Sequence, residues 1–318
     1  MSHVAAGTEP PATVASGRFG ARRSGRLKPY ALVFPAMAVL GLFFAAPAIY
    51  NIALSFQRVS LFELGEGGTW VGLANFREIL RDSRIYHALW NTAFWLTAVT
   101  VVTRLVLGLA LALLLNASVF KRWHLTGVTR SLLLLPWVTP QVVAVAAWSW
   151  LLEPRFGVVN QLLMNLGVID QRQAFLAKTS TVWPAVDLIL VWRELPFVVI
   201  AFLAGLQSIP NDLKEAARVD GASELRVLRS VTLPLLRPVT AVVALLTTIW
   251  TFNNFVYVWL TTRGGPGDYT QVLATRVYSA AFIDYRFGMA AAIGVFMSVI
   301  MLLFAIVYFF LVFRERER

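Results

Sequence analysis

Residues 287–313 read FGMAAAIGVFMSVIMLLFAIVYFFLVF and contain no charged side chain. As an α-helix this stretch would be about 40 Å long, which exceeds the roughly 30 Å hydrocarbon core of a bilayer. Residues 30–56 form a second run of the same length that also lacks a charge. Because soluble proteins rarely contain such runs, both stretches predict membrane-spanning helices.

The composition extends this prediction to the whole chain. Hydrophobic residues make up 58% of the sequence and charged residues 14%, against about 45–50% and 25% in a typical soluble domain. Four more apolar segments separate the two runs, so we expect an all-α polytopic membrane protein with six transmembrane helices. The predicted spans are residues 30–56, 86–116, 128–152, 182–206, 238–262 and 287–313.

The distribution of basic residues predicts the orientation. Residues 1–28 are rich in Ala, Gly, Ser and Pro and become basic toward their end, which is typical of a flexible tail on a membrane surface. Residues 29–318 then form the transmembrane domain, and its first apolar run is too long for a signal peptide. Alternate connections hold sixteen and ten Lys and Arg residues, with Lys121 and Arg122 on the richer side. The positive-inside rule therefore places the tail, both termini and the loop 207–237 in the cytoplasm.

Several classes of function are disfavoured by composition. The net charge of +11 lies beside apolar spans and not in a basic tract with interleaved aromatics, so we expect membrane lipid and no nucleic acid as a partner. The chain has no cysteine and three dispersed histidines, so no metal site is expected. No Gly-Lys dipeptide occurs, and a phosphate-binding loop for ATP therefore cannot form.

Prolines interrupt several predicted spans. In a membrane they can bend or break a helix along a transport pathway, or they can reflect the general frequency of proline in membrane helices. Both readings stay open for Pro35, Pro47, Pro136, Pro140, Pro184 and Pro196.

The loop 207–237 has the pattern of two short amphipathic helices. Asn211 or Asp212 can cap the first helix, and Gly221 can end it in a left-handed conformation. Ser223 begins the second helix, and Pro234 marks its transition to the next span. Such a pair can form a docking surface for a partner or can rest on lipid headgroups.

The residue spacing in this loop resembles the EAA signature of bacterial binding-protein-dependent ABC permeases. The resemblance implies that Glu215 to Gly221 form a coupling helix held in a groove of a separate ATPase subunit. The residues that match the signature or lie in this helix, and that we expect to couple to the ATPase, are Glu215, Ala216, Ala217, Asp220, Gly221, Leu233 and Pro234.

Shorter motifs resemble the sugar-permease branch of this family, in particular the maltose-type first subunit of a heterodimer. They are found at residues 72–76, 135–137, 156–160, 252–255 and 261–266. The resemblance implies a bacterial inner membrane location, a second permease subunit, two ABC ATPase subunits that hold ATP and Mg, and an extracytoplasmic solute-binding protein. The connection 57–85 is shorter than in some relatives, so contacts made there by a larger insertion cannot be assumed.

Candidate substrate residues lie in the later spans, because polar groups inside a membrane are costly and serve a pathway or a helix contact. Asn253 and Asn254 can hydrogen-bond to a sugar, and the same asparagines can instead hold helices together. Arg104 needs a partner that the sequence does not identify. The candidates for the substrate pathway are Asn253, Asn254, Phe252, Tyr257, Trp192, Arg193 and Glu194. Arg193 and Glu194 can instead pair with other helices as part of the structure.

We therefore expect a permease subunit that translocates a mono- or oligosaccharide and has neither enzymatic activity nor a cofactor of its own. One alternative is an importer of a glycerol phosphate or phosphodiester, in which Arg193 or Arg104 neutralises the phosphate. A secondary transporter is a more remote alternative. A membrane enzyme is disfavoured because no cluster of Asp or His is evident in the sequence.

Overall fold

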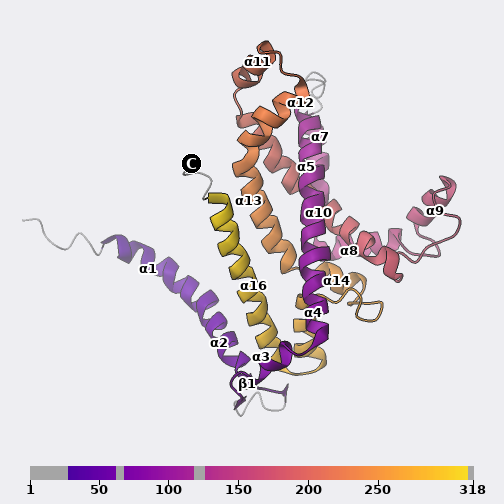
Figure 1. Cartoon of the computed structure of the whole chain (residues 1–318). Helices are drawn as coiled ribbons and strands as arrows, with labels where there is room; N and C mark the ends of the chain where they lie inside the picture. Colours follow the sequence, from indigo (N-terminus) through magenta and orange to yellow (C-terminus); the bar gives the residue numbers. More distant parts are fainter. Residues whose placement is uncertain (1–27, 62–67, 118–125, 314–318) are drawn as a thin grey trace, which may run out of the picture. The chain divides into compact units, whose positions relative to one another are not determined.

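The computed structural model describes residues 28–61, 68–117 and 126–313 (Figure 1). Residues 1–27 of the predicted basic tail, and the loop residues Lys121 and Arg122, lie outside the described residues. The chain divides into two units, residues 1–50 and residues 51–318.

The described part of the first unit, from residue 28 onward, is a single apolar helical segment. It consists of α1 (Lys28–Leu40), the π-helical turn η2 (Gly41–Ala45) and the beginning of α2 (Ala46–Ser55). The segment Leu32–Ser55 is long and apolar enough to cross a membrane. Neither Pro35 nor Pro47 interrupts it.

In the described part of the second unit, the regular elements are helices and one short antiparallel ribbon. The elements of its first half are β1 (Gln57–Arg58), β2 (Thr69–Trp70), α3 (Ala74–Ile79), α4 (Ser83–Trp90), η4 (Asn91–Val99), α5 (Thr100–Asn116), α7 (Thr126–Val138), α8 (Gln141–Leu151) and α9 (Val158–Asn165). Those of its second half are α10 (Thr179–Ser208), α11 (Asn211–Val219), α12 (Glu224–Val227), η5 (Leu228–Thr232), α13 (Leu233–Phe252), α14 (Val256–Thr261), α15 (Leu273–Tyr278), η6 (Ser279–Ile283) and α16 (Phe287–Phe313).

The number of apolar helices agrees with the prediction of an all-α membrane protein. Over the described residues, five helices are long and apolar enough to cross a membrane, or six if one bent pair forms a single span. The bent pair is α7 and α8, which meet at 98°. Pro140 lies at this break, whereas Pro184 and Pro196 lie inside the continuous helix α10. Proline therefore breaks one span and leaves another unbroken.

Helix α10 forms the centre of the bundle and packs against α5, α7 and α13 (Figure 1). A Cβ atom on Gly108 of α5 would lie 2.6 Å from the Cγ1 atom of Val198 on α10, so this glycine lets the two helices approach closely. Phe202 and Leu236, which are 1% exposed, lie in the hydrophobic cluster between α5, α10 and α13. Dispersion contacts at this close approach hold the helices together in lipid.

Side-chain hydrogen bonds connect the start of η4 to the segment that precedes α15. The Asn91 amide nitrogen donates to the carbonyl oxygens of Tyr269 and Gln271, at 2.9 Å each. The Thr92 hydroxyl accepts a hydrogen bond from the Leu273 backbone nitrogen at 2.9 Å. Both side chains are buried, and the bonds to Gln271 and Leu273 satisfy buried backbone groups.

Candidate functional site

Helix α11 lies at the end of the second unit where α10 finishes (Figure 1). It contains no buried residue. Glu215, Ala216 and Asp220 are exposed, and Ala217 is half-buried. Helix α11 therefore offers an open surface to a partner.

The end of α11 depends on Gly221, as the sequence predicts. Its φ angle is +80°, in the left-handed region that favours glycine. The backbone nitrogen of Ala222 donates to the Ala217 carbonyl at 2.9 Å, and that of Gly221 donates to the Arg218 carbonyl at 3.0 Å. These two bonds form a Schellman motif, which satisfies carbonyls at the end of the helix.

Two expectations about this loop are wrong. Neither Asn211 nor Asp212 caps α11, because Pro210 occupies the capping position and no side-chain cap bond forms. The helix after Ser223 does not end at Pro234 but continues as one helix from Glu224 to Phe252. The wide π turn η5 directly precedes Leu233 and Pro234 and accommodates the proline ring, which would clash in a regular helix interior.

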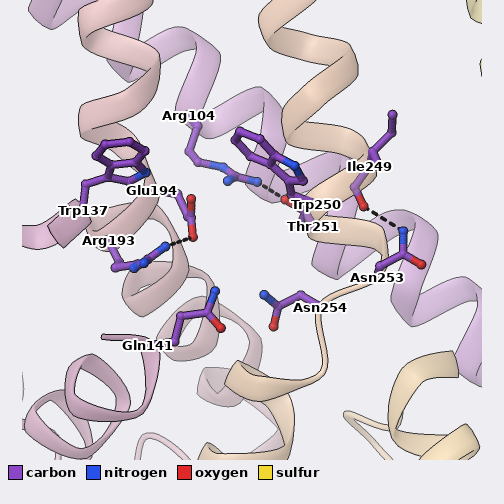
Figure 2. Close-up of a pocket in the computed structure, with 10 residues that line it drawn as sticks. All are labelled: Arg104, Trp137, Gln141, Arg193, Glu194, Ile249, Trp250, Thr251, Asn253 and Asn254. Atoms are coloured by element: carbon purple, nitrogen blue, oxygen red, sulfur yellow. Dashed lines mark hydrogen bonds and ion pairs between the residues drawn. The ribbon is translucent and has the colours of Figure 1, made fainter. Parts of the chain in front are cut away.

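A cavity of about 540 Å³ lies where α5, α7, α8, α10 and α13 meet (Figure 2). Four predicted residues line it, namely Arg193, Glu194, Asn253 and Asn254. Arg104, whose partner was unknown from the sequence, also lines it. The other lining residues are Trp137, Gln141, Ile249, Trp250 and Thr251.

Arg193 and Glu194 form an ion pair at the cavity wall. Nη1 of Arg193 lies 2.6 Å from Oε1 of Glu194, and both side chains are largely buried. Nε of Arg193 donates to the Thr139 carbonyl at 3.2 Å. Since Thr139 lies at the break between α7 and α8, Arg193 satisfies a carbonyl that the bend leaves without a helical partner.

Arg104 is held by uncharged groups. It is 1% exposed, and its Nε atom donates to the Thr100 carbonyl at 3.3 Å. Its Nη2 atom donates to the Thr251 hydroxyl (Figure 2). The Thr100 hydroxyl in turn donates to Asp187 at 2.9 Å. Arg104 therefore links α5 to α13, and Thr100 links α5 to α10.

The polar residues Asn253 and Asn254 lie at the end of α13 and not inside a span. Helix α13 ends at Phe252, and α14 begins at Val256, so the predicted span 238–262 is interrupted. The Asn254 side-chain oxygen accepts from the Tyr257 backbone nitrogen at 3.2 Å, while the Asn253 amide donates back to the Ile249 carbonyl at 2.9 Å. Each asparagine therefore satisfies a backbone group beside the break.

Three predicted pathway residues do not line the cavity. Phe252 is buried in a hydrophobic cluster with residues of α15 and α16. Trp192 packs edge-on against Trp148, with ring centroids 5.7 Å apart. Tyr257 is fully buried behind the wall, where its hydroxyl donates to Glu194 at 3.4 Å.

Sequence reasoning missed two polar lining residues. Gln141 is an isolated amide in an apolar segment directly after Pro140, and this pattern was a usable signal. The sequence contains no such signal for Thr251, because threonine is common in the later spans. Trp137 lies in the motif at residues 135–137, and Trp250 lies three residues before Asn253, but neither position in the sequence indicates that the indole lines a cavity.

Comparison with known proteins gives consistent results. Residues 104–317 match the family described as binding-protein-dependent transport system inner membrane component. The chain is 34% identical to the diacetylchitobiose uptake system permease protein of Streptomyces coelicolor, over 93% of this chain and 90% of that protein. It is 33% identical to the trehalose/maltose transport system permease protein of Thermococcus litoralis, over 88% of this chain and 91% of that protein.

A solved structure has the same fold. It is a bacterial ABC transporter involved in the import of the acidic polysaccharide alginate, and its chain superposes with a TM-score of 0.75. The match covers 91% of this chain and 97% of the other, at 24% sequence identity.

Proposed function

This chain belongs to the family of binding-protein-dependent transport system inner membrane components, and we propose that it is the permease subunit of an ATP-driven importer for a sugar. The relatives named for diacetylchitobiose and for trehalose and maltose support a sugar as the substrate. The sugar would cross the membrane through the cavity between α5, α7, α8, α10 and α13.

The observation that carries this proposal is the mixture of polar and aromatic groups in the cavity. Arg193 and Gln141 supply donors, Glu194 supplies an acceptor, and Trp137 and Trp250 supply flat apolar surfaces. A sugar presents hydroxyl groups at its rim and apolar C–H groups on its ring faces, so it needs both kinds of contact. A cavity of about 540 Å³ is also within the usual range for small-molecule sites.

A phosphate ester is a weaker candidate for this cavity. An anionic phosphate would require a guanidinium group whose positive charge is not already neutralised. The charge of Arg193 is paired with the carboxylate of Glu194, which would repel a phosphate. Arg104 donates to Thr100 and Thr251 and is almost fully buried.

The motor for transport would be a separate subunit. Helix α11, with exposed Glu215 and Ala216, would sit in a groove of one of two ABC ATPase subunits, which hold ATP and Mg. A second permease subunit would complete the pathway, and a solute-binding protein would deliver the sugar from outside. In this arrangement α11 and both termini face the cytoplasm. ATP-driven closure of the ATPases would move α11 and switch the cavity between its two openings.

The test uses the complete complex in lipid nanodiscs, purified together with the proteins encoded by neighbouring genes. ATP hydrolysis is measured with the binding protein and a panel of mono-, di- and trisaccharides and glycerol phosphodiesters. We expect one saccharide to stimulate hydrolysis, and Gln141→Leu to lower the apparent affinity about five- to tenfold, the effect of about one lost hydrogen bond.

Gln161→Leu is the matched control, because this glutamine lies exposed on α9 and its side chain donates a hydrogen bond to Asn165, away from the cavity. Stimulation by a phosphodiester and not by any saccharide would overturn the choice of substrate. Transport without a co-purifying ATPase would overturn the whole proposal.

A further inference from the structure

A second cavity, of about 590 Å³, lies in the second unit beside the beginning of α13. Its walls come from α5, α10, η5, α13 and α16. Among the described residues, it has no lining residue in common with the cavity of Figure 2. We name it the arginine cavity, because Arg229 of η5 and Arg237 of α13 both line it.

The wall of the arginine cavity combines positive charge with an apolar surface. Arg229 and Arg237 are the charged residues among the described residues that line it, and both are exposed. The hydroxyl groups of Thr240 and Tyr308 each donate to a backbone carbonyl of α13, at 3.0 and 2.6 Å. A ligand in this cavity therefore meets two guanidinium groups and an otherwise largely apolar surface.

The positive charge lies at one end of the cavity. Arg229 and Arg237 belong to the continuous helix Glu224–Phe252, and Ala244 lines the cavity about 10 Å beyond Arg237 along that helix. The helix begins beside α11 (Figure 1), so both arginines lie nearer to α11 than the apolar wall at Ala244. In the orientation proposed above, the arginines are at the cytoplasmic side of the membrane.

The cavity is open at the side of the bundle. Val106 of α5 lines it and is 61% exposed. This residue belongs to Ser83–Asn116, a helix long and apolar enough to cross a membrane. The exposed apolar surface of such a helix contacts lipid or another apolar helix.

The chemistry of the cavity distinguishes between possible occupants. An apolar helix of a companion subunit would cover the apolar wall but would bring no anion to the arginines. A free inorganic anion would pair with the arginines but would leave the apolar wall uncovered. A phospholipid with a net negative headgroup supplies both an anion for the guanidinium groups and an acyl chain for the apolar wall.

We propose that the arginine cavity binds one anionic phospholipid of the cytoplasmic leaflet. Arg229 and Arg237 hold the headgroup phosphate, and an acyl chain lies along the apolar wall formed by α5, α10, α13 and α16. This inference goes beyond the proposed function, because it does not depend on which solute is transported.

The test uses the complete complex in nanodiscs with equal parts of phosphatidylglycerol and phosphatidylcholine, without solute or ATP. In parallel samples one of the two lipids carries a photoreactive diazirine in its acyl chain. Mass spectrometry after illumination and digestion quantifies the label on residues 105–109 of α5. We expect a clear excess of label from phosphatidylglycerol, and we expect Arg229→Gln and Arg237→Gln each to reduce this excess about fivefold, the effect of one arginine beside an anionic headgroup.

Two further variants separate a specific site from general attraction to a negative membrane surface. Arg226→Gln is the matched control, because Arg226 is exposed on the same continuous helix and does not line the cavity. It removes the same charge and should leave the excess unchanged. Arg229→Lys keeps a positive charge at the cavity and should retain most of the excess.

Three results would overturn the inference. They are equal labelling of residues 105–109 by the two lipids, an equal loss of the excess in Arg226→Gln, and the absence of lipid label on this segment. The last result would indicate that a helix of a companion subunit covers the cavity. Because the labelling requires neither solute nor ATP, its outcome is independent of the outcome for the proposed function.

Discussion

Arg193 and Glu194 are neighbours in sequence, and their side chains form an ion pair of 2.6 Å at the wall of the cavity. Arg193 also donates to Thr139 at the bend between α7 and α8, and Glu194 also accepts from Tyr257 of α14. One pair of adjacent residues therefore connects α10 to two interrupted helices. This places a structural link at the position where a ligand would bind.

Removal of one partner should be more harmful than removal of both. Glu194→Ala leaves Arg193 buried without its counter-charge, and we expect it to cost about 3–5 kcal/mol of stability. The double variant Arg193→Ala, Glu194→Ala leaves no unpaired charge and should be less destabilised than the single variant. Thermal unfolding midpoints of the purified complex measure both. A double variant less stable than Glu194→Ala would contradict this account of the pair.

The left-handed residue at the end of α11 offers a test of coupling. Gly221 has a φ of +80°, and a Cβ atom there would meet nothing within 4 Å. Gly221→Ala should therefore cost about 1–2 kcal/mol through backbone conformation alone and should weaken the association of the ATPase. Gly167→Ala is the matched control, because Gly167 has a φ of +67°, equally open space, and a position after α9. An equal loss of ATPase association in both variants would show that Gly221 has no specific role in coupling.

The closest approach of α5 and α10 can be tested by a compensating change. Gly108→Ala places a Cβ atom against Val198, and we expect it to destabilise the bundle by about 1–3 kcal/mol through overpacking. Adding Val198→Ala removes the atom that the new Cβ atom meets first and should restore part of the loss. Thermal midpoints of the two variants and of Val198→Ala alone form the cycle. Additive effects would show that these two positions are not in contact.

A surface pair outside the spans predicts a dependence on pH. Arg286 donates to both carboxylate oxygens of Glu78, at 2.8 and 2.7 Å, and these hydrogen bonds hold the pKa of Glu78 below its ordinary value. The pairing therefore stabilises the folded state above the unfolded pKa of about 4.3 and is lost as the pH falls through the lowered folded pKa. Both side chains are about half exposed, so the contribution should stay below about 1 kcal/mol.

The measurement is the thermal midpoint between pH 6 and pH 3 for the unmodified protein and for Glu78→Gln. The variant should be slightly less stable at pH 6, and the difference should disappear at pH 3. A difference that stays constant across this range would exclude the titration of Glu78 as its cause.

The length of an apolar run was sufficient to predict the bounds of some helices and not of others. The run without charges at 287–313 coincides with α16, because nothing in it competes with a helix. The break after Phe252 was not predicted, because the apolar residues 255–260 continue the hydrophobic segment beyond it. The break becomes visible only when Asn253 and Asn254 are seen to satisfy backbone groups there.

The candidate site was predicted in part for a similar reason. Polarity inside a span identified Arg193, Glu194 and the two asparagines, all of which line the cavity. Polarity could not predict which aromatic residues line it, since the direction of a side chain depends on how its helix packs. Trp192 and Phe252 pack against other rings and helices, whereas Trp137 and Trp250 reach the cavity.

The contacts of Asn91 and Thr92 also constrain how the chain is made. Their partners, at residues 269–273, leave the ribosome nearly two hundred residues later. Until then Asn91 lacks the two carbonyl oxygens to which it donates, and Thr92 lacks the backbone N–H from which it accepts. Unpaired polar groups cost free energy in lipid. We therefore expect the packing of the early spans to be complete only after the later segment has been inserted. A ribosome stalled before residue 269 should leave a product that membrane proteases degrade.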